Sequence, residues 1–119
     1  MSTHDLAFTK VAETSEIPVA KMKMVRIRDN EVLIANVNGR YYAISNPCTH
    51  SHGSLSDGSL EGNIVTCPIH GSKFDVTTGK NVVGPGSRFF RAKVSDATSY
   101  EVRVDGKDIL LYQRSPWGI

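Results

Sequence analysis

Residues 48–70 read CTHSHGSLSDGSLEGNIVTCPIH and hold the only two cysteines of the chain and three of its four histidines. The stretch opens with Cys48-x-His50 and closes with Cys67-x-x-His70, and sixteen residues separate the two pairs. Thiolate and imidazole are the side chains that most often hold transition metals, so two Cys/His pairs supply a complete set of four ligands. We therefore expect the remainder of the chain to hold two loops face to face.

The segment around this stretch, from residue 46 to residue 86, is rich in glycine, proline, serine and threonine, which favour turns and loops. Only two short pieces resemble strands, Ile64–Thr66 before the second cysteine and Lys73–Val76 after the last histidine of the stretch. Both ligand pairs are therefore expected in loops that short strands support, which is a common arrangement for a functional site.

The sequence on either side predicts strands. Glu31–Val37 is rich in β-branched and aliphatic residues, Asn38 and Gly39 supply the positive φ angles of a type I′ turn, and Tyr41–Ile44 completes a hairpin that leads directly to Cys48. Further strands are expected at Leu6–Ala12, Lys21–Arg28, Phe89–Val94, Tyr100–Val104 and Ile109–Tyr112. No window has a helical period long enough to predict a helix.

These patterns predict an all-β fold. We expect one domain over residues 1–119, in which an antiparallel sheet base at approximately 1–45 and 87–119 carries an inserted, loop-rich subdomain at approximately 46–86. At 119 residues the chain is long enough to bury a core without the help of a metal.

Charge and composition narrow the function classes. The formal net charge is +2 and the charges are interspersed, which argues against nucleic acid or a membrane surface as the main partner. The N-terminus has neither a basic region nor an apolar run of the kind found in signal peptides and membrane spans, so we expect a cytoplasmic protein. In that compartment, a histidine beside each cysteine favours metal ligation over a disulfide.

Three interpretations of the four residues compete. In the first, the cysteines are small buried apolar side chains and the histidines are loop residues, although two Cys/His pairs seldom arise by chance. In the second, they bind zinc, but zinc pairs usually have Cys-x(2–4)-Cys or His-x(3–5)-His spacing. In the third, two cysteines hold one iron and two histidines the other iron of a two-iron cluster, whose neutral imidazoles make it easier to reduce.

The segments Cys48–Leu55 and Cys67–Asp75 resemble the two cluster-binding boxes of Rieske [2Fe–2S] proteins. The resemblance extends to the hairpin turn at 38–39 before the first box and to Gly84-Pro85-Gly86 after the second, and it covers most of the chain. It implies that the cofactor is one Rieske-type [2Fe–2S] cluster. The ligands implied for one iron are Cys48 and Cys67, and those implied for the other iron are His50 and His70.

Other positions resemble the soluble, low-potential branch of that family. High-potential members carry an extra cysteine in each box and a tyrosine bonded to a cysteine ligand, whereas this chain has Gly53, Ile69 and Phe74 at those positions. Ser72 keeps a hydroxyl that resembles the donor to a bridging sulfide, and Pro85 belongs to a loop that covers the cluster in the family. The resemblance implies a potential in the lower part of the roughly −150 to +300 mV range of such centres.

The member most like this chain is the free-standing Rieske-type ferredoxin. That resemblance implies a monomeric one-electron carrier, not an enzyme, that links a flavin-dependent reductase to a terminal oxygenase or another acceptor. Two alternatives stay open, a Rieske-fold small subunit of a larger reductase and a redox- or iron-sensing module. His52 is interpreted as an ordinary loop histidine, with a role at a docking surface as the alternative.

Overall fold

The computed structural model describes residues 8–49, 53–69, 71–83 and 94–112, and within them the protein consists of strands, turns and two single-turn 3-10 helices. The all-β prediction is confirmed, and none of the described helices is long and apolar enough to cross a membrane. The strands are β1 Phe8–Glu13, β2 Met22–Ile27, β3 Asn30–Val37, β4 Arg40–Ser45, β5 Ser59–Glu61, β6 Ile64–Thr66, β7 Lys73–Asp75, β8 Asn81–Val83, β9 Ser99–Tyr100, β10 Val102–Asp105 and β11 Asp108–Tyr112. The 3-10 helices are η1 Thr14–Glu16 and η2 Leu55–Asp57.

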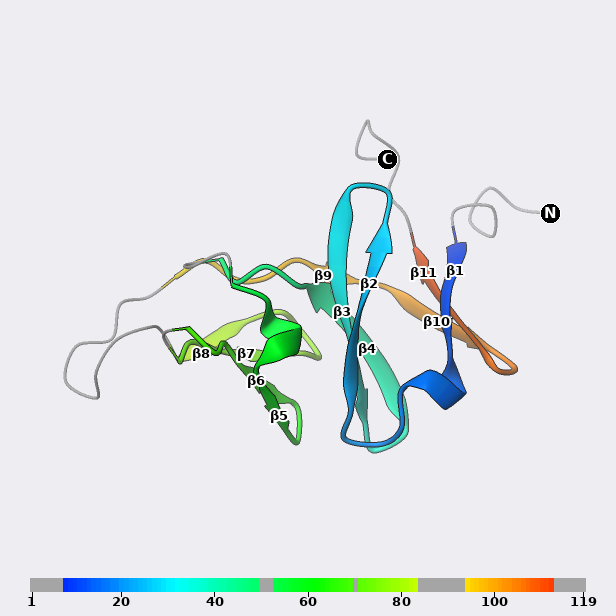
Figure 1. Cartoon of the computed structure of the whole chain (residues 1–119), viewed down its shortest axis with the longest axis horizontal. Coiled ribbons are helices and arrows are strands. Elements are labelled where there is room, and N and C mark those ends of the chain that lie inside the picture. Colours follow the sequence, from blue (N-terminus) through cyan, green and yellow to red (C-terminus); the bar gives the residue numbers. More distant parts are fainter. Residues whose placement is uncertain (1–7, 50–52, 70, 84–93, 113–119) are drawn as a thin grey trace.

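The strands form three antiparallel sheets, which follow one another across the molecule in Figure 1. The central sheet has the order β2-β3-β4-β9, the outer sheet has the order β1-β11-β10, and the small sheet has the order β5-β6-β7-β8. The small sheet, drawn in green, and the outer sheet lie on opposite sides of the central sheet (Figure 1). The chain therefore builds its base from both ends of the sequence and inserts the small sheet between β4 and β9.

The central hairpin forms where the sequence predicts it. β3 and β4 pair from Val32 opposite Ser45 to Val37 opposite Arg40. Asn38 and Gly39 have φ angles of 54° and 92°, the left-handed conformation that a type I′ turn requires at both central positions. Asparagine and glycine tolerate that conformation best, so this pair fixes the register of the hairpin.

Both faces of β3 are buried, because neighbouring residues on the strand pack into different cores. Leu33 and Ala35 belong to a first core that also contains residues of the small sheet, while Val32 and Ile34 belong to a second core shared with the outer sheet. A strand covered on both faces reads as a continuous apolar run instead of an alternating one. The first core is the one that contains both cysteines.

Some strands differ from the prediction. β5 and β8, of three residues each, were not predicted, and β9 was predicted only at Tyr100, as part of a longer strand. The single strand expected at Tyr100–Val104 is divided at Glu101, because β9 pairs with β4 of the central sheet and β10 pairs with β11 of the outer sheet. The expected strand Phe89–Val94 lies outside the described residues except for Val94, which belongs to no strand.

Candidate iron–sulfur centre

The first candidate loop follows β4 and is closed by backbone hydrogen bonds. Pro47 forms an isolated bridge with Ser54, and the Cys48 N–H donates to the Gly53 carbonyl at 2.7 Å. The Cys48 side chain points into the first core and is only 1% exposed. The Thr49 hydroxyl donates to the Ser95 carbonyl at 2.7 Å, so the loop is also attached to the segment that precedes β9.

The second candidate loop connects β6 to β7. Thr66 pairs with Lys73 across its base, and the Cys67 N–H donates to the Ser72 carbonyl at 2.8 Å. Gly71 has a φ of 75°, and its N–H donates to the Cys67 carbonyl at 3.2 Å. Glycine suits that left-handed position because it has no Cβ to clash. Cys67, like Cys48, is 1% exposed.

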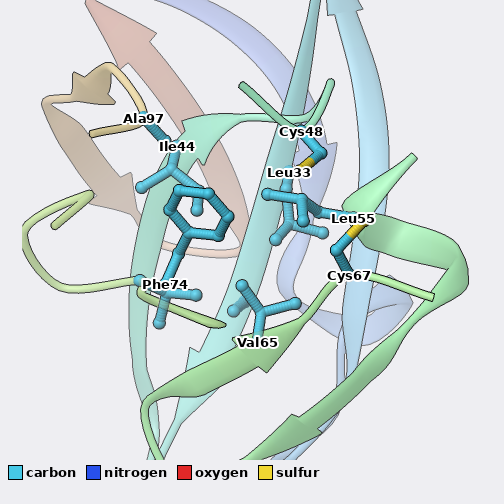
Figure 2. Close-up of a cluster of buried hydrophobic side chains, with 10 residues drawn as sticks. Leu33, Ile44, Cys48, Leu55, Val65, Cys67, Phe74 and Ala97 are labelled. Atoms are coloured by element: carbon cyan, nitrogen blue, oxygen red, sulfur yellow. The ribbon is translucent and has the colours of Figure 1, made fainter. Parts of the chain in front are cut away.

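The two loops therefore share one backbone hydrogen-bond pattern. In each of them the cysteine N–H donates to the carbonyl of the residue five positions later, which bends the chain around the thiol. Figure 2 shows both sulfur atoms at the same end of the first core, beside Leu55, and the two cysteines form no disulfide. The structure thus brings together the two predicted cysteine ligands from segments that are far apart in the sequence.

The other predicted ligands, His50 and His70, lie outside the described residues, as do His52 and Pro85. Within the described part of the chain, no group of three or more potential metal ligands of the His, Cys, Asp or Glu type is found. This result is expected, because two of the four predicted ligands lie outside that part of the chain.

Ser72 supplies a test of whether the loops fit an iron–sulfur cluster. Its side chain is fully buried, and its Oγ has no hydrogen-bond partner within the described residues. Leaving a buried hydroxyl unpaired costs about 1–3 kcal/mol, so such groups are rare unless a ligand or ion completes them. A bridging sulfide beside Cys67 would accept this hydrogen bond, and the donor set therefore fits the cluster.

Phe74 closes the same core from β7. Its ring is fully buried and belongs to the first core together with both cysteines (Figure 2). A phenyl ring has no hydrogen-bond donor for a cysteine sulfur, which is the property that the low-potential interpretation needs. The structure shows Phe74 in the same core as both cysteines, and its role beside a cysteine ligand stays a prediction.

Asp75 organises the turn after β7. Burial tends to raise its pKa, but hydrogen bonds from the Thr77 hydroxyl, the Thr77 N–H and the Asn63 side chain hold the pKa of this carboxyl below its usual value. The Asp75 carbonyl accepts the N–H of Gly79 at 2.7 Å. The turn that results presents the Gly79 carbonyl to the N–H of Ala97, a residue of the first core.

Sequence reasoning missed one polar residue beside the site. Asn46, two residues before Cys48, is fully buried and hydrogen-bonded through its side chain to three neighbours. Its position between a β-strand and a ligand box carries no period or motif, so only its closeness to the box could have drawn attention to it.

Comparison with known proteins identifies the family. The family model of the Rieske [2Fe–2S] domain matches residues 7–91. The chain belongs to this family. This Rieske protein is 34% identical over 107 residues to the biphenyl dioxygenase ferredoxin subunit of Pseudomonas sp. strain KKS102, and the match covers 89% of this chain and 92% of that relative.

Solved Rieske structures have the same fold. The ferredoxin of carbazole 1,9a-dioxygenase from Nocardioides aromaticivorans IC177 superposes with a TM-score of 0.77 at 27% identity and covers 91% of this chain and 99% of its own. A second similar chain, with a TM-score of 0.74, 28% identity and coverage of 89% and 93%, comes from a complex of reduced oxygenase and oxidized ferredoxin in carbazole 1,9a-dioxygenase.

These findings confirm the predicted family, the predicted cofactor, one Rieske-type [2Fe–2S] cluster, and an electron-transfer role with redox proteins as partners in place of catalysis. When bound, such a cluster accepts and releases one electron at a time. The assignment of individual ligands stays a prediction. The described residues of this Rieske domain contribute a buried apolar core that contains two thiols, two loops bent around these thiols, and an unpaired buried hydroxyl next to one of them.

Proposed function

We propose that this Rieske ferredoxin receives single electrons from a flavin-dependent reductase and passes them to the terminal oxygenase of a multicomponent dioxygenase system. The observation that carries the proposal is the match to a biphenyl dioxygenase ferredoxin subunit over nearly the full length of both chains. The solved complex of an oxygenase with a similar ferredoxin supports an oxygenase as the acceptor. A cytoplasmic location and a monomeric state belong to the same proposal.

Stopped-flow absorbance tests the two half-reactions separately. The purified host reductase, supplied with its nicotinamide donor, should bleach the visible band of the protein, and the host terminal oxygenase should restore the band when it is mixed with the reduced protein. Product formation by the oxygenase should require this chain. A protein that is reduced but returns no electrons to the oxygenase would count against a carrier and for a sensing role.

The proposed cluster ligands are Cys48 and Cys67 on one iron and His50 and His70 on the other. The pairing of both buried thiols in one core, on loops with the same backbone hydrogen-bond pattern, supports this set. The histidines follow their cysteines by two and three residues, which keeps each of them on the same loop as its cysteine. Each iron would then take one ligand from each loop.

The test of the ligand set uses the third histidine of the stretch as a matched control. His50→Ala and His70→Ala should each abolish the electron paramagnetic resonance signal of the reduced Rieske cluster and lower the iron content. His52→Ala should leave the signal and the iron content unchanged, since that residue is given no metal. Zinc without iron in the wild-type protein would refute the whole assignment.

We also propose how the chain is divided and which neighbours tune the cluster. The base is assigned to approximately 1–45 and 87–119 and the cluster-binding subdomain to approximately 46–86, within one domain. The described sheets support this division, because the small sheet and both cysteine loops lie between β4 and β9. The residues proposed to tune the potential are Ser72 as donor, Phe74 as the non-donating ring, and Pro85 as part of a covering loop.

A further inference from the structure

Asn46 is a buried polar residue whose role the cluster chemistry leaves unexplained. It follows β4 directly, precedes the first cysteine by two residues, and is 0% exposed. A side-chain amide with no access to water must satisfy its donors and acceptor within the protein. Its hydrogen-bond partners therefore show which parts of the molecule it holds together.

The backbone of Asn46 already joins two elements. Its N–H donates to the Glu31 carbonyl on β3 at 2.9 Å, and its carbonyl accepts the N–H of Leu55 at 2.9 Å. One neighbour therefore lies in the central sheet, and the other lies just after the first ligand loop.

The side chain repeats this connection. Its Nδ2 donates to Glu31 Oε1 at 3.3 Å and to Ser54 Oγ at 2.8 Å, while its Oδ1 accepts the N–H of Ser56 at 2.9 Å. The Ser54 and Ser56 hydroxyls are 2.8 Å apart, which joins the two loop contacts to each other. Both ends of the first ligand loop are thereby tied to the central sheet through one amide.

The second ligand loop is held by a different sheet. Thr66 and Lys73 pair at its base, and Lys73 Nζ donates to Thr66 Oγ1 at 3.0 Å, so its closure lies within the hairpin of β6 and β7. The two loops therefore belong to separate sheets. The position of one loop relative to the other therefore depends, together with the contacts of the segment before β9, on how each loop is attached to its own sheet.

We propose that Asn46 is a positioning residue that holds the first ligand loop against the central sheet and so sets its distance from the second loop. The inference rests on the proposed ligand set, in which each iron takes one ligand from each loop. A displacement of the first loop then strains the bonds to both irons. Neighbours that orient metal ligands in this way typically change metal affinity by about 10- to 100-fold when they are removed.

Asn36 provides a matched control for this proposal. It is also buried, at 3% exposure, and its amide likewise donates twice, to the Ile17 carbonyl at 2.9 Å and the Tyr41 hydroxyl at 3.2 Å, and accepts once, from the Gly39 N–H at 2.8 Å. Its partners Ile17 and Tyr41 belong to the second core or pack against it, away from both cysteines. Any general cost of losing a buried amide should therefore be similar for the two residues.

The experiment compares Asn46→Ala with Asn36→Ala in the cluster-loaded protein, at a temperature where both remain folded. Asn46→Ala should release iron to a chelator about 10- to 100-fold faster than the wild type and should shift the g values of the reduced cluster. Asn36→Ala should release iron at the wild-type rate and keep the wild-type spectrum. Equal release rates and unshifted spectra for the two variants would overturn the proposal.

A pair of variants that exchanges the amide of Asn46 and the carboxylate of Glu31 covers the case in which Asn46→Ala does not fold. Asn46→Asp keeps the acceptor for Ser56 but sets a carboxylate against that of Glu31, and Glu31→Gln supplies the missing donor. Asn46→Asp should lose iron quickly, and the double variant should recover slow release and the wild-type spectrum. Failure of the second change to rescue would contradict the proposal.

The same measurements separate this proposal from the proposed function. If the wild-type protein holds no iron, the ligand set itself has failed. If the wild type is loaded and transfers electrons while the asparagine variants behave alike, only the positioning role of Asn46 is lost.

Discussion

At the scale of single residues, the potential of the centre depends on which groups donate hydrogen bonds to the cluster sulfurs. Phe74 belongs to the core that contains both thiols and has no donor, and Ser72 carries a buried hydroxyl that finds no acceptor in the described residues. A hydrogen bond of about 1 kcal/mol that favours the reduced state corresponds to about 40 mV for a one-electron couple. The effect of hydrogen bonds on the potential can therefore be tested by adding a donor at Phe74 and by removing the donor at Ser72.

Phe74→Tyr should raise the reduction potential by about 40 mV, because the new hydroxyl would donate to a cysteine sulfur and stabilise the more negative, reduced state. Protein-film voltammetry measures the shift. Phe74→Leu, which adds no donor, should give no rise. A tyrosine variant with an intact cluster signal and an unchanged potential would show that the hydroxyl does not reach the sulfur.

Ser72→Ala should lower the potential by about 40 mV, since it removes the proposed donor to the bridging sulfide. The metal-free protein should lose no stability in urea unfolding, because an unpaired buried hydroxyl does not stabilise the fold and its desolvation opposes folding. Ser45 is the control, as its Oγ accepts the Thr98 N–H at 3.1 Å. Ser45→Ala should cost about 1 kcal/mol of stability and leave the potential unchanged. An unchanged potential together with a loss of stability in Ser72→Ala would reject the assignment of Ser72 as a donor to the cluster.

At the scale of elements, the segment before β9 joins the small sheet to the first ligand loop. The Gly79 carbonyl accepts the Ala97 N–H at 2.7 Å, and the Ser95 carbonyl accepts the Thr49 hydroxyl. Gly79 has a φ of 84°, and a Cβ built there would lie 2.2 Å from the Ala97 carbonyl oxygen. The close approach of the two backbones therefore requires glycine.

Gly79→Ala should destabilise the metal-free protein by clearly more than the 1–2 kcal/mol that left-handed backbone alone costs, because the segment 94–98 must also move. Gly62 separates the two effects: its φ is 59°, and apart from its chain neighbours no atom of the described residues lies within 4 Å of a Cβ built there. Gly62→Ala should cost only about 1–2 kcal/mol in urea unfolding. Equal losses of stability in the two variants would mean that the close contact with Ala97 does not require glycine at position 79.

The elements also show what the sequence could predict. The β3–β4 hairpin was predictable because a β-branched run and an Asn-Gly turn each demand it locally, and the two cysteines were predictable as a pair from their spacing. β9 was not, since Ser99 and Tyr100 form a strand only by pairing with Ile44 and Ala43 of a distant hairpin. The role of Asn46 was not predictable for the same reason. Its side-chain partners come close only in the folded chain, and its neighbours in the sequence do not reveal them.

At the scale of the whole molecule, the central sheet separates two cores that differ in their relation to the cysteines. The first core contains both cysteines, and the second joins the central and outer sheets. Leu33 and Ile34 are adjacent on β3 and both fully buried, yet they belong to the first and the second core respectively. One strand thus allows the two cores to be tested against each other.

Leu33→Ala and Ile34→Ala should each reduce the free energy of unfolding of the metal-free protein by about 2–5 kcal/mol, the usual cost of such truncations. Only Leu33→Ala should also speed the release of iron, because its cavity opens in the core that packs against the thiols. Chelator assays well below both melting temperatures measure the release. Equal release rates at equal stability would show that the two cores are not independent.

The first core also has a consequence for biogenesis. Leu33 and Ile44 come from the central sheet, while Val65 and Phe74 come from the small sheet, so the two cysteine side chains come together only after the two sheets have packed (Figure 2). A chain still emerging from the ribosome cannot complete this core until Val76 has been synthesised. We therefore expect the cell's iron–sulfur assembly machinery to deliver the cluster late, to an acceptor that is already folded.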